Sequence, residues 1–374
     1  MKGCFSLSTP LDQWALWEKT GAKRIPFSFD LEITARCNNN CRHCTINLPA
    51  EDGAASQNEL SLETIREIVS QAVSMGALWG LITGGEPLLR EDFVPIYLHM
   101  KEMGLLVSVF TNATLLTAEH VRLFKNYPPR DIEATVYGVT QETYEQVTRK
   151  RGSFGAFRRG LDLLLEGGIP VRLKAMALRS NLHEIRAIAG FCREKTKDYF
   201  RIDPFLHLRY DSNHERNEEI RAERLSPEEI GSLETSDPER LEALQQRCKR
   251  WIARDGLNTQ CDHLFQCGAG SASFSVSFDG LFRLCPSLWH RDCVYDLKNG
   301  NLKEAWETLV PRVRDMRSES RGFLETCRGC TIADLCMWCP GNADLETGLM
   351  DGSADYFCRV AHRRAELLGM TDIG

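Results

Sequence analysis

The stretch FSFDLEITARCNNNCRHC, residues 27–44, joins an apolar segment to three closely spaced cysteines. Its first part, Phe27–Thr34, is rich in Phe, Leu and Ile, which is typical of a strand covered on both faces of its sheet. Cys37, Cys41 and Cys44 follow, and the first of them comes three residues beyond that segment. The stretch therefore predicts three thiols grouped at the carboxyl end of a buried strand.

Strand-like and helix-like segments alternate from this point to about residue 210. Six βα units in succession imply an α/β fold with a parallel sheet and right-handed crossovers. Such a sheet is either doubly wound or curled into part of a barrel, and in both architectures the ligand binds at the carboxyl ends of the strands. The candidate strands are Phe27–Thr34, Leu78–Thr83, Leu105–Thr111, Ile132–Tyr137, Val171–Leu178 and Phe200–His207.

Two helix starts can be recognised between these strands. Asn181 is followed three residues later by Glu184, a spacing that predicts a helix beginning with a capping box. The other start is at Ser61, and the apolar residues after it are spaced for one helical face. They are Leu62, Ile65, Ile68, Val69 and Ala72.

The composition limits the class of protein. A chain of 374 residues exceeds the usual size of a single core, so we expect two domains. A net charge of −6 argues against a nucleic-acid partner or an anionic membrane surface. No apolar stretch approaches the roughly 18 residues of a transmembrane helix, and residues 1–20 lack the features of a secretory signal. We therefore expect a cytoplasmic protein whose cysteines bind metal or perform redox work.

Eleven of the fifteen cysteines fall into two groups. A four-iron cubane cluster takes four thiolates, so the three upstream cysteines would leave one iron open to another ligand. Of the cysteines outside both groups, Cys192 has the setting of a buried small hydrophobe, Cys293 is a reserve ligand, and Cys4 and Cys248 match no motif. The downstream group is Cys261, Cys267, Cys285, Cys327, Cys330, Cys336, Cys339 and Cys358.

The upstream triad and a second motif resemble the radical S-adenosylmethionine (SAM) superfamily. The second motif is Gly84–Pro87, Gly-Gly-Glu-Pro, which directly follows the second candidate strand. The resemblance implies a partial (β/α)6 TIM-like barrel in which Cys37, Cys41 and Cys44 hold a [4Fe-4S] cluster. It implies that the open iron binds SAM and passes it one electron, which releases a 5′-deoxyadenosyl radical that abstracts hydrogen from a substrate.

The same resemblance implies a set of SAM contacts. Gly84, Gly85, Glu86 and Pro87 would bind the amino group of the methionine part, and His43 would lie near the adenine. Polar residues at later strand ends would contact the carboxylate and the ribose of SAM. His207 and Arg209, at the end of the sixth candidate strand, would face the substrate. The further predicted SAM contacts are Asn112, Thr135, Lys174 and Arg179.

The downstream cysteines resemble the SPASM extension of radical SAM enzymes. The resemblance implies two auxiliary [4Fe-4S] clusters, for three clusters in all, held in a small loop-rich C-terminal iron–sulfur domain. The predicted divisions are an N-terminal extension (1–25), the barrel (26–210), a helical connector (211–260) and the SPASM domain (261–374). One auxiliary cluster would use Cys261, Cys267, Cys285 and Cys339, and the other Cys327, Cys330, Cys336 and Cys358.

Other functions are compatible with parts of this pattern. His43 could complete a zinc site with the triad, and Cys327-x2-Cys330 also begins many zinc sites, which would make the chain a zinc-stabilised binding module. A non-catalytic iron–sulfur electron carrier is a third possibility. His43 adjoins Cys44, and adjacent residues seldom both reach one metal, which argues against the zinc site. Gly84–Pro87 and the three-cysteine site argue against the electron carrier.

SPASM enzymes mostly modify peptides, so the resemblance favours a ribosomally made peptide or a protein side chain as substrate, with a small molecule such as a porphyrin, sugar or cofactor precursor as the alternative. Pro286 stands where sulfatase-maturing enzymes commonly have Asp, which argues against that activity. About 25 residues precede the first candidate strand. We therefore expect either a separate leader-peptide-binding protein or a substrate without a leader. A flavodoxin or ferredoxin would act as the reductant.

Overall fold

Six parallel strands form the centre of the protein. The computed structural model describes residues 23–196, 201–238, 241–242, 244–245 and 262–370. The strands pair in the order in which they occur along the chain, with no reversal. They are β1 (Ser28–Thr34), β4 (Trp79–Gly84), β5 (Leu106–Thr111), β6 (Asp131–Thr135), β7 (Val171–Met176) and β8 (Arg201–Asp203).

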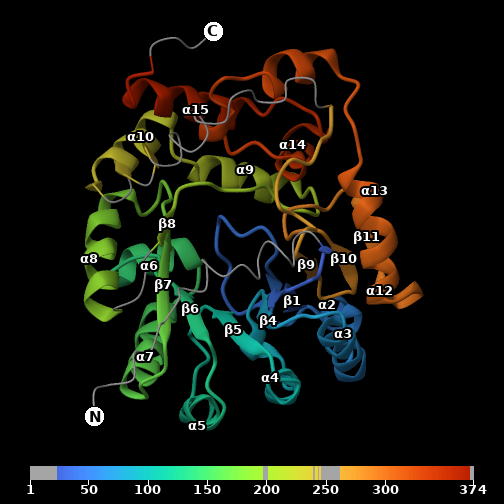
Figure 1. Ribbon diagram of the computed structural model, residues 1–374. Coiled ribbons are helices and arrows are strands. Elements are labelled where there is room, and N and C mark those ends of the chain that lie inside the picture. Colours follow the sequence, from blue (N-terminus) through green and yellow to red (C-terminus); the bar gives the residue numbers. More distant parts are fainter. Residues whose placement is uncertain (1–22, 197–200, 239–240, 243, 246–261, 371–374) are drawn as a thin grey trace, which may run out of the picture.

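This sequential order distinguishes the two architectures that the sequence allowed. A doubly wound sheet reverses its strand order at a switch point, whereas a barrel keeps it. The partial-barrel prediction is therefore confirmed, and Figure 1 shows the helices along the outer side of the curved sheet. These helices are α2 (Gly53–Asn58), α3 (Leu62–Ser74), α4 (Phe93–Glu102), α5 (Ala118–Asn126), α6 (Gln141–Thr148), α7 (Ser153–Glu166) and α8 (Ile185–Lys195).

The first predicted helix start is confirmed at α3. The Ser61 side chain accepts a hydrogen bond from the backbone N–H of Thr64, which satisfies one of the free donors of the first turn. Four of the five apolar positions of the predicted face are buried: Ile65, Ile68, Val69 and Ala72.

The predicted capping box at Asn181 is wrong. A short 3₁₀ turn, Leu182–Glu184, comes first, and α8 begins only at Ile185. The buried Asn181 amide instead bonds Leu178, Tyr137 and Met176 backbone groups, which ties the ends of β6 and β7 together. The Glu184 carboxylate accepts from the backbone N–H of Val139, ahead of α6. Both side chains therefore form hydrogen bonds outside the predicted helix start instead of capping it.

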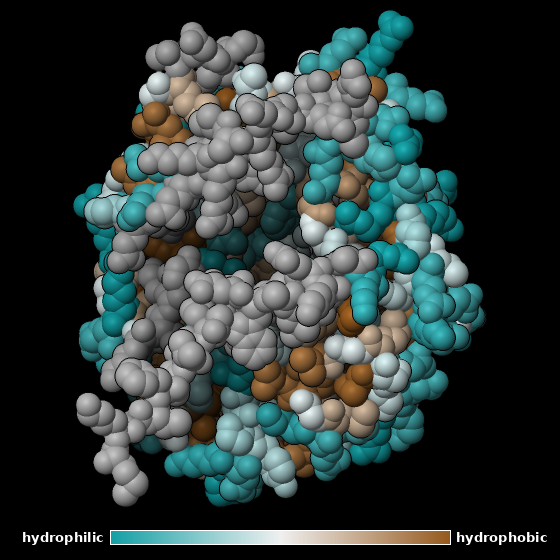
Figure 2. Space-filling view, in the orientation of Figure 1, coloured by the Kyte–Doolittle hydropathy of each residue, from teal (hydrophilic) through white to brown (hydrophobic). Residues whose placement is uncertain are grey.

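Alternate residues of β1 have different surroundings. Leu31 and Ile33 are buried in the main core with side chains of α3 and α4. Asp30 and Glu32 point to the other face of the sheet, because side chains alternate along a strand. Glu32 pairs with the fully buried Arg283 at 2.6 Å. The interior of the partial barrel is thus polar, and the central hollow of the face in Figure 2 is lined by hydrophilic side chains.

The C-terminal region adds strands to the free edge of β1, which the sequence did not predict. β9 (Ser273–Val276) runs parallel to β1, and β10 (Leu281–Arg283) and β11 (Val294–Asp296) continue the sheet in antiparallel fashion. The sixth candidate strand is also shorter than predicted, because within the described residues only Arg201–Asp203 is strand.

Helices and turns complete the region after the barrel. The described part of the predicted connector contains two helices, α9 (His214–Glu223) and α10 (Pro227–Thr235). The cysteine-rich region consists mainly of loops and short turns, with α12 (Leu302–Glu304), α13 (Val310–Arg314), α14 (Pro340–Thr347) and a 13-residue helix α15 (Asp355–Leu367) that contacts α10. No helix in the described ranges is long and apolar enough to cross a membrane.

Candidate functional site

Three thiols lie together at the carboxyl end of β1. The cluster loop, residues 37–47, begins where the two-residue strand β2 (Arg36–Cys37) pairs with β3 (Leu48–Pro49). Burial raises the pKa of Cys37 to about 12, with Glu86 and Cys44 adding to the shift, and burial raises the pKa of Cys41 well above its usual value, with Cys44 and Cys37 adding to it. Thiols in such a setting are held as thiolates only when a cation compensates their charge, so this donor set fits a metal cluster.

The backbone of the cluster loop is anchored on two sides. The N–H groups of Asn40 and Arg42 donate to the last carbonyls of α6, at 2.9 and 3.3 Å. From the other side, Arg209 donates to the Cys44 carbonyl at 3.3 Å, and Arg216 of α9 donates to the Cys41 carbonyl at 2.8 Å. The backbone of the cluster loop is therefore held by contacts with α6, Arg209 and Arg216.

Gly84 and Gly85 bring the end of β4 against the cluster loop. The Gly85 N–H donates to Thr34 O at 2.7 Å, and the next N–H donates to Arg36 O at 2.8 Å. A Cβ at Gly84 would overlap Thr34 O, and one at Gly85 would overlap Arg36 O. Gly84 also has a φ of +138°, which favours glycine. The two glycines thus permit close approach of backbone to backbone.

Glu86 connects this loop to the end of β5. Its carboxylate accepts from the Thr111 hydroxyl at 2.7 Å, the Asn112 N–H at 2.7 Å and the Leu88 N–H at 3.1 Å. Burial raises the pKa of Glu86 to about 7, against the effect of these three donors. A carboxylate offers about four acceptor positions, so one position on Oε2 is left for a further donor such as an ammonium group.

Asn112 lies beside the first thiol of the triad. Its Nδ2 donates to Asn38 Oδ1 at 2.8 Å and lies 3.7 Å from Cys37 Sγ. Asn38 in turn donates to Thr114 at 2.8 Å. The structure thus brings Asn112 and Gly84–Pro87, both predicted from sequence, to the same end of the sheet as the triad.

His43 is buried against Tyr137, with ring centroids 5.2 Å apart. Burial, with smaller effects of Lys174 and Arg216, lowers the pKa of His43 to about 4, so its ring is neutral near pH 7. Its Nδ1 has no hydrogen-bond partner among the described residues. A buried ring nitrogen without a partner is a position where a bound ligand would supply one.

The remaining predicted SAM contacts differ in their surroundings. Thr135 is buried at the end of β6 and is paired in register with Lys174 of β7. The Lys174 ammonium is 2.6 Å from the Glu133 carboxylate. Arg179 is half-exposed and pairs with Glu229 of α10. The contacts of Arg179 therefore connect the barrel to the connector, and nothing among them supports SAM binding.

His207 and Arg209, which we expected to face the substrate, contact other segments of the protein. His207 is nearly buried, 6.3 Å from the Phe357 ring of α15, and burial lowers its pKa. Arg209 is 2% exposed and is bound by Asp211 at 2.6 Å as well as by the cluster loop. Both residues join the barrel to elements packed above it, which a strand pattern does not reveal.

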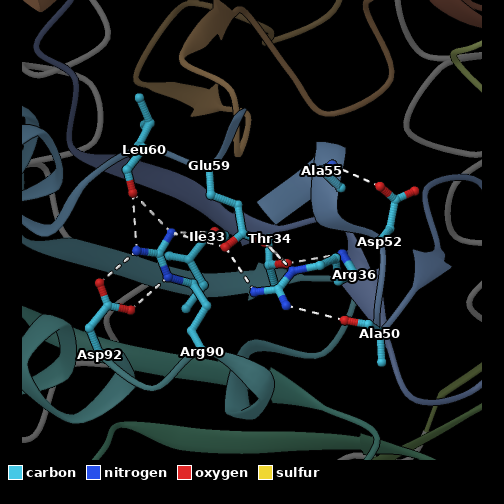
Figure 3. Close-up of polar contacts among 10 residues, drawn as sticks. All are labelled: Ile33, Thr34, Arg36, Ala50, Asp52, Ala55, Glu59, Leu60, Arg90 and Asp92. Atoms are coloured by element: carbon cyan, nitrogen blue, oxygen red, sulfur yellow. Dashed lines mark hydrogen bonds and ion pairs between the residues drawn. The ribbon is translucent and has the colours of Figure 1, made fainter. Parts of the chain in front are cut away.

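A buried charge network supports the start of the cluster loop (Figure 3). Arg36 pairs with Glu59 at 2.8 Å and also donates to Ala50 O. Arg90 donates to Leu60 O at 3.0 Å and pairs with Asp92 at 2.6 Å. The network fixes the residue that precedes Cys37, and no sequence motif indicated it because its members come from separate segments.

The described downstream thiols affect one another electrostatically in two sets. Burial raises the pKa of Cys339 to about 11, and Cys285 and Cys267 add to the shift. Since such electrostatic effects act over short distances, these three thiols are neighbours. The fourth predicted member, Cys261, lies outside the described residues, as do Cys4 and Cys248.

The second group is complete within the described residues. Burial raises the pKa of Cys336 to about 11, and Cys358, Cys330 and Cys327 each contribute. Cys358 is likewise affected by Cys330 and Cys327. The grouping of these thiols agrees with the interleaved pairing that the sequence predicted, although the pairing itself stays a prediction.

Among the described residues, the two cysteines outside these groups are buried. Cys192 of α8 is part of the hydrophobic core, as predicted. Cys293 lies 3.6 Å from Met350 Sδ and 3.9 Å from Met316 Sδ. Its apolar surroundings give it the role of a core residue.

No three Cys, His, Asp or Glu side chains in the described ranges are arranged around a single metal ion. A four-iron cluster takes one thiolate at each iron, so its ligands need not converge on one point.

Comparison with known proteins identifies the barrel. Residues 31–192 match the Radical SAM superfamily. The AdoMet-dependent heme synthase of Methanosarcina barkeri is 31% identical over 166 residues, 44% of this chain and 46% of that protein. The PqqA peptide cyclase of Bradyrhizobium diazoefficiens is 28% identical over 167 residues, 43% of this chain and 42% of that protein. The chain spans about half the length of the first curated relatives that it matches.

Solved structures show the same fold over more of the chain. Streptococcus suis SuiB bound to S-adenosylmethionine superimposes with a TM-score of 0.66 at 17% identity, covering 91% of this chain and 80% of that chain. SuiB bound to its precursor peptide SuiA gives a TM-score of 0.66 at 18% identity, covering 94% and 82%. These matches extend beyond the barrel into the cysteine-rich C-terminal region.

Proposed function

We propose, from the premise that residues 31–192 form a radical SAM domain, that this chain reductively cleaves SAM and uses the product to abstract hydrogen from a peptide or protein substrate. The observation that carries the proposal is the convergence at one sheet edge of the triad, the Gly84–Pro87 loop and Asn112. Three thiols leave one position of a four-iron cluster open, and the neighbouring loop offers a free acceptor on Glu86.

Each part of this edge has a defined task in the proposal. Cys37, Cys41 and Cys44 would hold the cluster, and Gly84–Pro87 with Asn112 would bind the methionine part of SAM. When bound, the cluster and SAM would supply a 5′-deoxyadenosyl radical. The neutral His43 would offer its unpartnered Nδ1 to the ligand without adding a second positive charge beside a sulfonium.

The cluster loop would be held rigidly while it acts. Arg209 and Arg216 bind the carbonyls of Cys44 and Cys41, and Glu86 ties the β4 loop to β5. A site assembled from such fixed elements positions its reacting groups with little reorganisation.

The two downstream thiol groups would hold auxiliary clusters. Four thiolates complete a cubane, so a cluster with four protein ligands has no open iron for substrate. We infer that these clusters accept the electron left after hydrogen abstraction. Trapping of substrate on an auxiliary iron would contradict this role.

A peptide substrate is supported by the relatives. SuiB, which has the same fold, is solved with a precursor peptide, and the PqqA peptide cyclase is similar in sequence. A small-molecule substrate is the second candidate, because the AdoMet-dependent heme synthase matches at 31% identity.

The activity is tested with anaerobically reconstituted protein, dithionite and SAM. We expect 5′-deoxyadenosine to form, and we expect the Cys41→Ala protein to form none while it keeps the iron of the auxiliary groups. If the wild-type protein with a full iron content never forms 5′-deoxyadenosine, the proposed function is wrong.

The substrate class is tested by isotope transfer. A deuterated candidate peptide, encoded near this gene, should transfer deuterium into 5′-deoxyadenosine. Transfer from a deuterated porphyrin precursor, with none from peptides, would favour the second candidate.

A further inference from the structure

A fully buried arginine connects the barrel to one group of downstream thiols. Arg283 of β10 donates to the carbonyl of Pro286, the residue after Cys285, at 2.8 Å. The same guanidinium pairs with Glu32 of β1 at 2.6 Å. Burial raises the pKa of Cys285, and the charge of Arg283 opposes that shift. Because one cation interacts with both segments, a change of charge at these thiols also changes the field at the carboxylates of β1.

The other group of downstream thiols has a similar arginine whose pairing is complete. Arg364 of α15 donates to the carbonyl of Leu335, the residue before Cys336, at 2.7 Å. Its Nε and Nη2 both donate to the Glu234 carboxylate, so this buried pair is bidentate. One positive charge is therefore balanced by one negative charge beside this group.

The pair at Arg283 is less complete and has a further acid beside it. Among the described residues, Nη2 alone donates to Glu32, and the buried Nε of Arg283 has no hydrogen-bond partner. Asp30 lies two residues before Glu32 on the same face of β1. Within the same part of the chain it forms no ion pair and accepts one hydrogen bond, from Ser275 at 3.3 Å. One cation therefore serves two buried carboxylates.

Asp30 is the carboxylate whose charge the fold leaves uncompensated. Its neighbours in register are Ser275 of β9, which adjoins β1 in Figure 1, and Leu81 of β4, and neither carries a charge. Burial is the largest effect on the pKa of Asp30 and raises it to about 6. Of the charged groups that act on Asp30, Glu32 adds to this increase and Arg283 opposes it. At pH 7 the side chain is thus a largely buried base that is still mostly ionised.

We propose that Asp30 takes up one proton when the auxiliary cluster that Cys285 would bind gains one electron. The inference rests on the proposed function, because it requires that cluster, and deepens it by giving the electron acceptor a proton acceptor on β1. The substrate radical loses one electron, the cluster gains it, and the Asp30 carboxylate takes a proton from the solvent and becomes a carboxylic acid. Reduction adds a negative charge near two carboxylates that share one cation, and protonation of Asp30 offsets that charge.

The test uses the Cys41→Ala protein, which should keep only the two auxiliary clusters. Redox titration followed by electron paramagnetic resonance gives the midpoint potential of each cluster between pH 6 and pH 8, where Asp30 is mostly ionised before reduction. We expect the equilibrium constant for reduction of one cluster to fall at least about threefold per pH unit. The limit for one proton per electron is tenfold, or about 59 mV. The other cluster, beside Arg364 and Glu234, should change less than about 1.5-fold per unit.

Three substitutions in this protein identify the group that takes up the proton. Asp30→Asn keeps an acceptor for Ser275 but has no carboxylate, so it should remove the pH dependence. It buries one charge fewer, so we expect it to fold. Asp30→Glu keeps a carboxylate and should retain the pH dependence. Glu234→Gln changes a buried acid beside the other thiol group and should retain it as well. A purely structural role of Asp30 would move the midpoint potential without changing its slope against pH.

The proposal is overturned if neither midpoint potential depends on pH, or if Asp30→Asn leaves the slope unchanged. Loss of the slope in the Asp30→Glu or the Glu234→Gln protein, or absence of iron from the downstream thiols, would overturn it as well. Failure of the proposed function is a separate result. Formation of 5′-deoxyadenosine is measured with the wild-type protein and SAM, whereas these titrations contain no SAM and use a protein without the first cluster.

Discussion

The cluster loop and the cysteine-rich C-terminal region hold their thiols in different ways. In the cluster loop, Cys41 is buried, and the backbone is bound by α6, Arg209 and Arg216. In the C-terminal region, Cys267 and Cys358 are exposed, and most of the thiols lie on short turns and loops.

The difference indicates which part of the fold depends on metal. Because α6, Arg209 and Arg216 all bind the backbone of the cluster loop, we expect the loop to keep its shape when the cluster is removed. The C-terminal region buries less around its thiols, and metal binding to such regions contributes directly to folding free energy. The predictions below test this contrast.

The largest effect is expected from Cys41→Ala. Loss of a cluster ligand should reduce 5′-deoxyadenosine formation by at least about a hundredfold, since even loss of an outer-shell partner costs up to that much. Liquid chromatography measures the product, and the variant should keep about eight irons per chain. The urea midpoint of the iron-free protein should change little, because the loop is fixed by other contacts.

Cys192→Ala is the matched control for this experiment. It removes a buried thiol from α8 and should leave the iron content and 5′-deoxyadenosine formation unchanged. Wild-type activity in the Cys41→Ala protein would contradict the assignment of the triad.

Cys336→Ala should affect stability more than chemistry. Loss of one auxiliary cluster would remove about four irons per chain and lower the Tm by roughly 5 °C or more. Uncoupled SAM cleavage should persist. Cys293→Ala, a buried cysteine beside Met350 and Met316, should keep its iron. Iron loss in that control instead would show that the ligand groups are assigned wrongly.

Much of the fold follows from local pattern. Five of the six strands and the buried face of α3 are visible as apolar periodicity, which depends only on neighbouring residues. The grouping of the downstream thiols came from the resemblance to SPASM domains, and it stays a prediction. The triad and the Gly84–Pro87 motif identify the functional edge of the sheet.

The rest depends on contacts between distant segments. β9 has four residues, and its partner β1 lies some 240 residues earlier, so no local sequence pattern predicts that these strands pair. The sequence predicted that Arg209 faces the substrate and gave Arg216 no role, but both residues bind the cluster loop. Asn181 failed as a helix cap because its amide binds the ends of two strands instead.

Gly85→Ala tests whether close backbone approach shapes the first site. The new Cβ would overlap Arg36 O and Ala35 O, so the cluster loop must move. We expect a loss of about 1–3 kcal/mol in the free energy of unfolding and at least about a tenfold loss of SAM cleavage. Urea titration and product analysis measure the two effects.

Gly190→Ala provides the comparison for this change. Gly190 lies inside α8 with open space around its Cβ position, so alanine there should stabilise the protein by about 0.5–1 kcal/mol. If the two substitutions change SAM cleavage and the free energy of unfolding equally, the close approach of β4 to the cluster loop is not needed for activity.

The last prediction concerns stability alone, at the seam where the two regions meet. Asp30 of β1 accepts from Ser275 of β9 at 3.3 Å, and burial raises its pKa from 3.8 to about 6. Between pH 4 and pH 6 the folded protein therefore keeps a proton that the unfolded chain has released, so this group lowers stability as the pH rises through that window.

Asp30→Asn keeps an acceptor for Ser275 and removes the titration. Relative to wild type, the variant should gain stability between pH 4 and pH 7, by up to about 3 kcal/mol for a shift of this size. Urea midpoints across that range measure the gain, with the exposed Asp355→Asn as control. If the free energies of unfolding of wild type and Asp30→Asn change with pH in the same way, water reaches Asp30 in the folded protein. The C-terminal strands would then contact the barrel less closely than the pairing of β9 with β1 implies.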